Sequence, residues 1–340
     1  MLQVQELERI GLGNFPTPLE FLPRLSGKLG PSIFVKRDDM TGLAMGGNKV
    51  RKLDFLLADA RRKKADIVIT TSGIQSNWAR QTTAAAVKLG MRVLLMLRTA
   101  QFKEFPTQYD GNLLLDHLMG AEVRFLNMKI DQDPSAHLIA AADELRQKGH
   151  NPYVLQIHEA EAPLTTIAYY DAMREIQTQR PGKQFNYVVV AAGGGTTLGG
   201  LTLGAKLLSP KTKVLGVNVG AFKKSTIIKS IVESAEKASK ILGVENTLTP
   251  EDVTVIDDYY GEDYGITTPQ SLEAIRMTAS TEALIIDPVY TSKAMSGLID
   301  MCRKGVLKKE DSVCFIHTGG VPALFAYRDS FPMSQAHKLS

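Results

Sequence analysis

Short apolar runs alternate along this chain with longer segments in which apolar residues recur at helical spacing. Helical spacing is clearest in residues 50–60 and in residues 79–87, which run up to a stop at Gly90. The short apolar runs are residues 67–70, 93–96, 187–190, 214–217 and 313–316. Because strands that alternate with helices are typical of βαβ units, the pattern predicts an α/β fold built on parallel sheets.

The length of the chain adds a second expectation. Its 340 residues exceed what a single hydrophobic core usually supports, so we expect two domains with a cleft between them. No internal repeat, low-complexity segment or linker rich in Pro, Gly or Ser marks a boundary. The division must therefore follow from topology.

Composition and charge exclude several classes of partner. The chain is 44% hydrophobic and 22% charged, which is typical of a globular protein. Its net charge of +4 is scattered, and the longest basic run, residues 61–64, ends a predicted helix where cations are favourable. We therefore expect no nucleic-acid partner.

Without a signal-peptide pattern or an apolar stretch that could span a bilayer, we expect a soluble, cytoplasmic protein with no membrane partner.

The two cysteines, Cys302 and Cys314, show neither a CxxC motif nor the spacing of a disulfide framework. This usage favours a reducing compartment and two buried thiols, and it excludes a metal site built on sulfur.

A glycine-rich loop follows the strand predicted at residues 187–190. It consists of Gly193, Gly194, Gly195, Thr196 and Thr197 and precedes an apolar helical stretch. Glycines let backbone N–H groups converge on an anion, and the helix N-terminus and the two hydroxyls add to its attraction. The loop predicts a phosphate site, although a plain strand-to-helix turn would look similar.

A dinucleotide is a poor fit to this loop. Leu198 stands where a third glycine would be expected, and residues 217–219 end the next strand without an acidic side chain. A phosphate-bearing ligand other than NAD is therefore favoured.

Lys49 is the leading candidate for covalent chemistry. It follows Gly46, Gly47 and Asn48 and opens a predicted helix, where the macrodipole helps an ammonium to lose its proton, as a Schiff-base amine must. A solvated surface lysine is the ordinary alternative. We treat Lys52, three residues further on, as a decoy.

Other predicted strands also end in polar groups. Ser76 and Asn77 follow the strand at 67–70 and open a helix, where they could clamp a carboxylate or simply cap the helix; both can hold at once. Residues 285–291 and 315–323 end apolar runs in the same way. Because ligands collect at the carboxyl ends of parallel strands, we expect these segments to form one site.

In this order the segments resemble the 1-aminocyclopropane-1-carboxylate deaminase / D-cysteine desulfhydrase family of pyridoxal-phosphate (PLP) enzymes. The resemblance runs over nearly the whole chain, and its motifs are residues 17–20, 36–39, 46–49 and 322–327. It implies the fold type II architecture, with two open, twisted, mostly parallel sheets flanked by helices. It further implies a large PLP-binding domain of residues 1–52 and 157–340, an inserted small α/β domain of residues 53–156, and a homodimer.

The resemblance also implies roles for individual residues. Lys49 matches the lysine that forms the Schiff base with PLP, and Gly193 to Thr197 match the loop that holds the cofactor phosphate. Ser76 and Asn77 match a pair beside the substrate carboxylate, with Asn77 also near the pyridoxal 3′-oxygen. Tyr264 and Tyr290 match two tyrosines of the substrate site.

Two positions separate the branches of this family. Ring-opening deaminases carry Glu and Leu where this chain has Thr291 and Thr318, which is the desulfhydrase-like choice. A hydroxyl near the pyridine nitrogen leaves that nitrogen neutral, which suffices when the β-substituent departs easily. We therefore expect a lyase acting by α,β-elimination, with D-cysteine as substrate and pyruvate, ammonia and hydrogen sulfide as products.

Two departures from the desulfhydrase pattern leave the substrate open. Trp78 replaces the usual His or Gln, and residues 157–161, with His158 and Glu159, replace a glycine-rich loop. Trp78 could pack beneath the sheet and the other pair could lie on the surface. Together they raise the hypothesis of another β-substituted amino acid, cysteate-like or carrying a cation that faces Glu159. A metal at His158 is not expected, because the HExxH spacing is incomplete.

Two further alternatives stay open. The chain could be a 1-aminocyclopropane-1-carboxylate deaminase, or a phosphate- or nucleotide-binding protein without catalysis. D- and L-substrates differ only in the groups around Cα, so the sequence does not specify the configuration.

Overall fold

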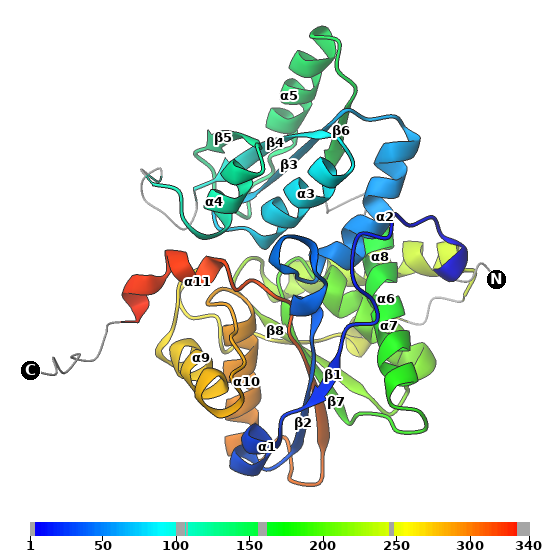
Figure 1. Cartoon of the computed structure of the whole chain (residues 1–340). Coiled ribbons are helices and arrows are strands. Elements are labelled where there is room, and N and C mark those ends of the chain that lie inside the picture. Colours follow the sequence, from blue (N-terminus) through cyan, green and yellow to red (C-terminus); the bar gives the residue numbers. More distant parts are fainter. Residues whose placement is uncertain (1–3, 100–105, 107, 156–161, 245–247, 332–340) are drawn as a thin grey trace, which may run out of the picture.

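The structure of the protein is a computed structural model, which describes residues 4–99, 106, 108–155, 162–244 and 248–331. Figure 1 shows two units, one above the other, each built around a sheet with helices on both sides. We refer to them as the six-stranded unit and the four-stranded unit.

The six-stranded unit holds the first and last strands of the chain. Its strand order is β1-β2-β10-β7-β8-β9, and only β1 runs antiparallel to its neighbour. The strands are β1 (Leu19–Phe21), β2 (Ser32–Lys36), β7 (Tyr187–Ala192), β8 (Lys213–Asn218), β9 (Thr254–Ile256) and β10 (Ser312–Ile316).

Both faces of this sheet are buried, as a parallel sheet requires. On β7, Val188 and Val190 pack with α6 (Ala162–Gln179), α7 (Thr196–Leu208) and α8 (Lys224–Leu242). Val189 and Ala191 point to the opposite face, which is covered by α1 (Pro23–Leu29), α9 (Pro269–Glu282) and α10 (Thr291–Arg303). Residues buried on both faces read as a continuous apolar run, which is why the sequence predicted this strand.

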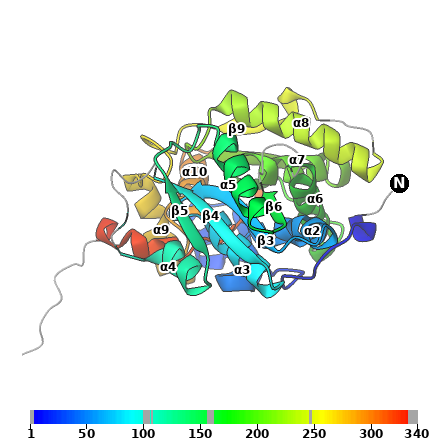
Figure 2. The same cartoon turned by 90° about the horizontal axis from the view of Figure 1, so that it is seen from above.

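The four-stranded unit is entirely parallel, with the strand order β5-β4-β3-β6. Its strands are β3 (Ile67–Gly73), β4 (Arg92–Arg98), β5 (Glu122–Leu126) and β6 (Pro152–Leu155). Figure 2 shows α2 (Lys49–Arg62) and α3 (Asn77–Lys88) on one side of this sheet and α5 (Ser135–Gln147) on the other. Two short helices, α4 (Gly111–Leu118) and α11 (Ala323–Ala326), lie against each other.

Helix α2 is fixed to the six-stranded unit by a buried ion-pair network. The Arg51 guanidinium binds the carboxylate of Asp38 at 2.8 Å and that of Glu175 at 2.9 Å, and Lys36 also contacts Glu175. Buried charges persist only when their partners satisfy them, so this network holds α2 in one position. It thereby fixes where the two lysines at the start of α2 point.

The predicted fold class is confirmed: the protein is an α/β protein with two mostly parallel sheets. The five strands predicted from apolar runs correspond to β3, β4, β7, β8 and β10, and both predicted helical segments lie within α2 and α3. Strand β2 was not predicted, because it ends in a charge, Lys36, whose burial depends on Glu175, Gln179 and the Thr17 carbonyl. The domain boundaries at residues 53 and 156 and the homodimer stay predictions.

Cys302 and Cys314 are both buried, as the sequence predicted. Across the described ranges, no helix is both long and apolar enough to cross a membrane.

Candidate active site

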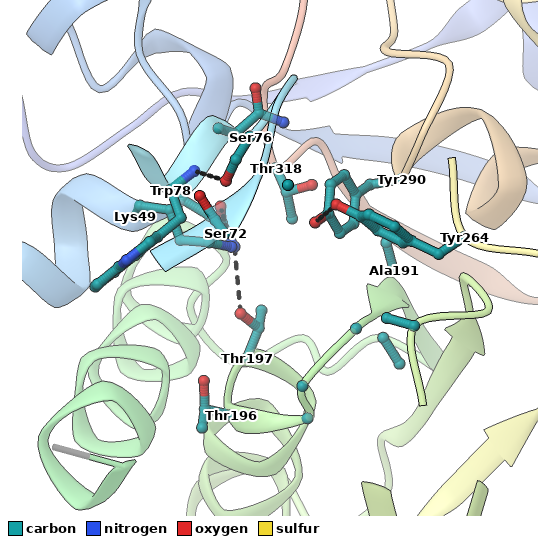
Figure 3. Close-up of a pocket in the computed structure, with 18 of the residues that line it drawn as sticks. Lys49, Ser72, Ser76, Trp78, Ala191, Thr196, Thr197, Tyr264, Tyr290 and Thr318 are labelled. Atoms are coloured by element: carbon teal, nitrogen blue, oxygen red, sulfur yellow. Dashed lines mark hydrogen bonds between the residues drawn. The ribbon is translucent and has the colours of Figure 1, made fainter. Parts of the chain in front are cut away.

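The main pocket lies where the carboxyl ends of strands from both sheets meet. The four-stranded unit contributes the end of β3, the start of α3 and the end of β4, and the six-stranded unit contributes the end of β7 and the start of α7. Figure 3 shows Lys49 and Ser76 on one side of this pocket and Tyr264 and Tyr290 on another. The strand ends predicted to converge do so.

The turn before Lys49 depends on glycine. Gly46 has φ +69°, and a Cβ there would lie 1.8 Å from the carbonyl oxygen of Asp39. The Gly46 carbonyl accepts a hydrogen bond of 2.6 Å from Arg80, and the Gly47 N–H donates to the Thr41 hydroxyl at 2.8 Å. No other residue type fits at Gly46 without displacing the backbone. The glycine turn therefore fixes the position of the backbone at the start of α2.

Lys49 has the properties of a reactive amine. Burial lowers its pKa to about 8, with Asp287 opposing that change and Arg80 adding to it. Its Nζ lies 3.1 Å from Asn48 Oδ1 and 5.9 Å from the centre of the Tyr290 ring. The side chain keeps some exposure because it lines the pocket. An amine with this pKa loses its proton near neutral pH, as a nucleophile and base must.

The glycine loop forms a cup at the start of α7. Gly195 has φ +93° and precedes Thr196, and no side chain caps the first turn of the helix. The Thr197 hydroxyl accepts a hydrogen bond from Asn48 Nδ2 at 3.3 Å, so the cup is tied to the Lys49 turn. Uncapped amides at a helix N-terminus bind anions well.

Lys52 completes this cup, although sequence reasoning set it aside. Its side chain is 3% exposed, and Nζ donates to the Thr196 hydroxyl at 2.8 Å. Burial lowers its pKa well below the usual value, and Lys49 adds to the effect. Of the described residues, none forms an ion pair with it. A buried ammonium without a carboxylate, beside free amides and hydroxyls, fits a phosphate.

The spacing of Lys49 and Lys52 could have predicted that both face the pocket. Residues three apart share one face of a helix, so a helix that presents Lys49 to the pocket also presents Lys52.

Ser76 caps α3, which was one of the two roles predicted for it from the sequence. Its Oγ accepts hydrogen bonds from the amides of Trp78 at 3.1 Å and Ala79 at 3.3 Å. Asn77 lines the pocket, and its Oδ1 accepts from Asn112 at 3.0 Å. The role of this pair as a carboxylate clamp stays a prediction.

Trp78 has a structural role whatever its contact with a substrate. It borders the pocket, but its indole is 4% exposed, packs in the core of the four-stranded unit and donates to the Thr70 hydroxyl at 2.8 Å. Figure 3 shows the ring directed away from the two tyrosines. The predicted substrate contact of Glu159 lies outside the described residues.

Tyr264 and Tyr290 face each other across the pocket wall. Their rings stand edge to face at 5.7 Å, and their hydroxyls share a hydrogen bond. Burial raises the pKa of Tyr290 to about 12 and that of Tyr264 well above its usual range. Both are therefore neutral hydroxyls at physiological pH, able to pass a proton but not to act as anions.

Thr291 and Thr318 occupy different positions. Thr318 lines the pocket, and its carbonyl accepts from the Asn48 amide at 3.0 Å. Thr291 is fully buried at the start of α10, and its hydroxyl and amide both bind the Asp287 carboxylate, at 2.5 Å and 2.7 Å. Asp287 also accepts from the amides of Val289 and Tyr290. Its negative charge is therefore held by the first turn of α10.

Behind the pocket, Arg80 and Asn112 link the two sides of the site. Arg80 donates to the Gly46 carbonyl and, at 3.0 Å, to Asn112 Oδ1, while Asn112 donates to Asn77. Near them lies Asp116, which is fully buried; its carboxyl oxygens form no hydrogen bond of good geometry within the described structure, although the Thr83 hydroxyl lies close to them. Burial raises the pKa of Asp116 to about 7, against partial opposition from Thr83 and Arg80.

This pKa predicts a pH-dependent cost of folding. In the unfolded chain Asp116 releases its proton near pH 4, but in the folded protein only near pH 7, so stability falls as the pH rises between these values. The full difference is at most about 4 kcal/mol. We therefore expect Asp116→Asn to gain stability over the wild type from pH 4 to pH 7.5, with no further gain above.

Urea unfolding at a series of pH values measures this gain. Asp143→Asn, on the exposed surface of α5, is the control for removing one carboxylate. If the two variants changed in parallel with pH, a buried protonated Asp116 would be refuted.

Comparison with known proteins identifies the family to which this pocket belongs. The family model for "Pyridoxal-phosphate dependent enzyme" matches residues 10–319. The chain is one of these enzymes. Its cofactor is therefore pyridoxal phosphate, as the sequence predicted.

Individual relatives show to which family of pyridoxal-phosphate enzymes the chain belongs. Proteins named "Putative 1-aminocyclopropane-1-carboxylate deaminase" are 39% identical in Pyrococcus furiosus, over 96% of both chains, and 40% identical in Pyrococcus horikoshii, over 94% of both chains. A crystal structure described as an ACC deaminase homologue superposes with a TM-score of 0.86 at 37% identity, covering 96% of each chain. The enzyme thus belongs to the 1-aminocyclopropane-1-carboxylate deaminase / D-cysteine desulfhydrase family. These names agree better with the deaminase alternative than with the expected D-cysteine desulfhydrase.

A more distant structure supports the fold alone. Threonine deaminase isoform 2 from Solanum lycopersicum has a TM-score of 0.63 at 18% identity, covering 93% of this chain and 85% of that one. It confirms the fold type II architecture.

The pocket fits the cofactor. Lys52, the amides at the start of α7 and the hydroxyls of Thr196 and Thr197 would hold the phosphate, and Lys49 would hold the aldehyde carbon. The residues that line the pocket, as far as the structure describes them, include no Asp or Glu.

Proposed function

We propose that this PLP enzyme is a lyase that removes the β-substituent of a small amino acid and releases ammonia and an α-keto acid. The observation that carries the proposal is the absence of a carboxylate from the described lining of the pocket. The buried carboxylate of Asp287 is engaged by three backbone amides and the Thr291 hydroxyl. A site of this kind supports a neutral pyridine ring, which is adequate for elimination of a good leaving group.

Bound PLP supplies an electron sink for the bond to Cα, and the protein supplies orientation and proton transfer. Lys49, with a pKa of about 8, takes the proton from Cα and can return it. The Ser76–Asn77 turn at the start of α3 binds the substrate carboxylate through helix amides. The paired hydroxyls of Tyr264 and Tyr290 pass a proton to the departing group.

D-cysteine is the specific substrate that the family pattern at Thr291 and Thr318 favours; of the two, Thr318 is among the described residues that line the pocket. Its products would be pyruvate, ammonia and hydrogen sulfide. Ring opening of 1-aminocyclopropane-1-carboxylate to 2-oxobutanoate and ammonia is the second candidate, which the names of the Pyrococcus relatives favour.

One substrate panel separates the candidates. The holoenzyme is incubated with 1-aminocyclopropane-1-carboxylate and with D- and L-forms of cysteine and other β-substituted amino acids, and each keto acid is identified. We expect pyruvate from a β-substituted amino acid and at least about tenfold lower kcat/KM for the cyclopropane, because the described lining of the pocket holds no acid that would make the ring a deep electron sink. Predominant release of 2-oxobutanoate would replace the proposal by the second candidate, and turnover of no amino acid would refute both.

A further inference from the structure

The described lining of the pocket carries more positive charge than the proposed function requires. Three cationic side chains line it, those of Lys49, Lys52 and Arg98, and no carboxylate is among its described lining. Lys49 is assigned to the cofactor carbon and the proton at Cα, and Lys52 to the cofactor phosphate. Arg98 remains without an assigned anion.

Arg98 lies at the carboxyl end of the four-stranded sheet, where hydrogen bonds fix its side chain. It is the last residue of β4 and stands opposite Gly73 of β3 in the parallel register. Its side chain is 5% exposed, and Nη1 donates to the carbonyl oxygens of Ile130 at 2.7 Å and Gln132 at 2.9 Å. Ile130 also lines the pocket and packs against the core of the six-stranded unit. Arg98 therefore lies at the junction of the two units.

The other N–H groups of the guanidinium donate no hydrogen bond within the described structure. Its Nε is buried without a hydrogen-bond partner, and in the described part of the chain no carboxylate forms an ion pair with it. Asp131 and Asp133 attract it electrostatically, but both are exposed. A buried guanidinium with unpaired N–H groups is costly, and an oxyanion bound in the pocket would compensate its charge.

The position of Arg98 relative to the carboxylate clamp indicates which anion it would bind. The chain after Gly73 leads directly to Ser76 and Asn77, whereas Arg98 ends the adjacent strand, about 5 Å to the side. Arg98 and the Ser76–Asn77 turn line the same pocket, so one small amino acid can present its α-carboxylate to the turn and a substituent on Cβ to Arg98. The carbonyls of Ile130 and Gln132 prevent Arg98 from turning away.

We propose that Arg98 binds an anionic group on the β-carbon of the substrate, so that the enzyme selects amino acids with a second negative charge, such as a β-sulfonate or β-phosphate ester. The proposal rests on the proposed lyase function and narrows its substrate class. It favours the cysteate-like hypothesis over a cationic substituent, which Arg98 would repel.

The reaction with a β-sulfonate is balanced without an oxidant or reductant. The proton on Cα passes to Lys49, the Cβ–S bond breaks, and its electron pair leaves with sulfur as sulfite. Uptake of one water molecule then yields pyruvate and ammonia. Arg98 stabilises the charge that develops on the departing group, which is where a fixed cation is most effective.

A first experiment compares substrates in the holoenzyme. We expect measurable pyruvate and sulfite from one enantiomer of cysteate, with a lower KM than for cysteine of the same configuration. In Arg98→Met the ratio of kcat/KM for cysteate to that for cysteine should fall about 30-fold or more, the value of a lost charge-assisted hydrogen bond. Arg98→Lys should recover part of the ratio. Equal losses for both substrates would overturn the proposal, because Arg98 would then bind the α-carboxylate.

A second experiment does not depend on turnover, and its decisive comparison uses the wild type. Isothermal titration of the wild-type holoenzyme with 3-sulfopropanoate and with propanoate compares ligands that differ only in the second anion. We expect at least about tenfold tighter binding of 3-sulfopropanoate, abolished in Arg98→Met if that variant folds. Equal affinity in the wild type would refute the role of Arg98 even if the enzyme proves to be a lyase. Conversely, tighter binding without turnover of any amino acid would uphold Arg98 and refute the proposed function.

Discussion

Replacement of Lys49 by alanine is expected to abolish the covalent attachment of pyridoxal phosphate and to reduce turnover by at least about 10³-fold. The magnitude follows because the variant loses both the nucleophile that holds the cofactor and the base that takes the proton from Cα. The pKa of about 8 and the position of Lys49 beside Tyr290 make it the amine best suited to both tasks. The measurements are the visible absorbance of the cofactor and the rate of keto acid release.

Borohydride reduction provides the direct assignment. In the wild type it should fix the cofactor to the peptide that contains Lys49, and in Lys49→Ala no lysine should be labelled. Lys63→Ala, which removes an exposed lysine at the end of the same helix, is the matched control and should keep both absorbance and turnover. Labelling of Lys52 in the wild type, or full activity in Lys49→Ala, would refute the assignment of Lys49.

Replacement of Lys52 by methionine is expected to weaken binding of pyridoxal phosphate to the apoenzyme about 10- to 100-fold. Its ammonium is buried beside Thr196, the uncapped amides of α7 and the Tyr169 ring, and within the described residues no carboxylate pairs with it. A charge-assisted hydrogen bond to phosphate accounts for a change of this size. Fluorescence titration of the apoenzyme with the cofactor measures the dissociation constant.

The control ligand for this experiment is pyridoxal, which lacks the phosphate. Because Lys52 would contact only the phosphate, Lys52→Met should reduce the preference for pyridoxal phosphate over pyridoxal, and inorganic phosphate should compete less well. At saturating cofactor, borohydride should still label Lys49 in this variant. An unchanged preference for the phosphorylated form would show that Lys52 does not bind the phosphate.

Much of the fold could be read from local pattern. Strand β7 is buried on both faces and so appears as an unbroken apolar run, and α2 and α3 bury one face each and so show helical spacing. Strands β5 and β6 were not predicted, because β5 mixes half-buried apolar residues with charges and β6 begins at Pro152. Their place in a sheet depends on neighbours distant in sequence.

The candidate site divides in the same way. Lys49 and the glycine loop could be predicted, because each requires a local arrangement of glycines at the start of a helix. Sequence analysis selected neither Arg98 nor Asp116, because only the tertiary structure shows that both are buried. Nothing in the residues around Lys52 indicates Thr196, which lies 144 positions away along the chain.

From the sequence alone came the alternation of strands and helices, the candidate phosphate loop and the candidate reactive lysine, because periodicity and turn chemistry act over a few residues. Tertiary structure alone decided which charges are buried and which anions they lack, because burial and ion pairing join segments far apart in the chain. Lys49 could therefore be proposed as the reactive lysine before the fold was known. The charge balance of the pocket, and with it the proposed role of Arg98, became visible only when the two sheets were brought together.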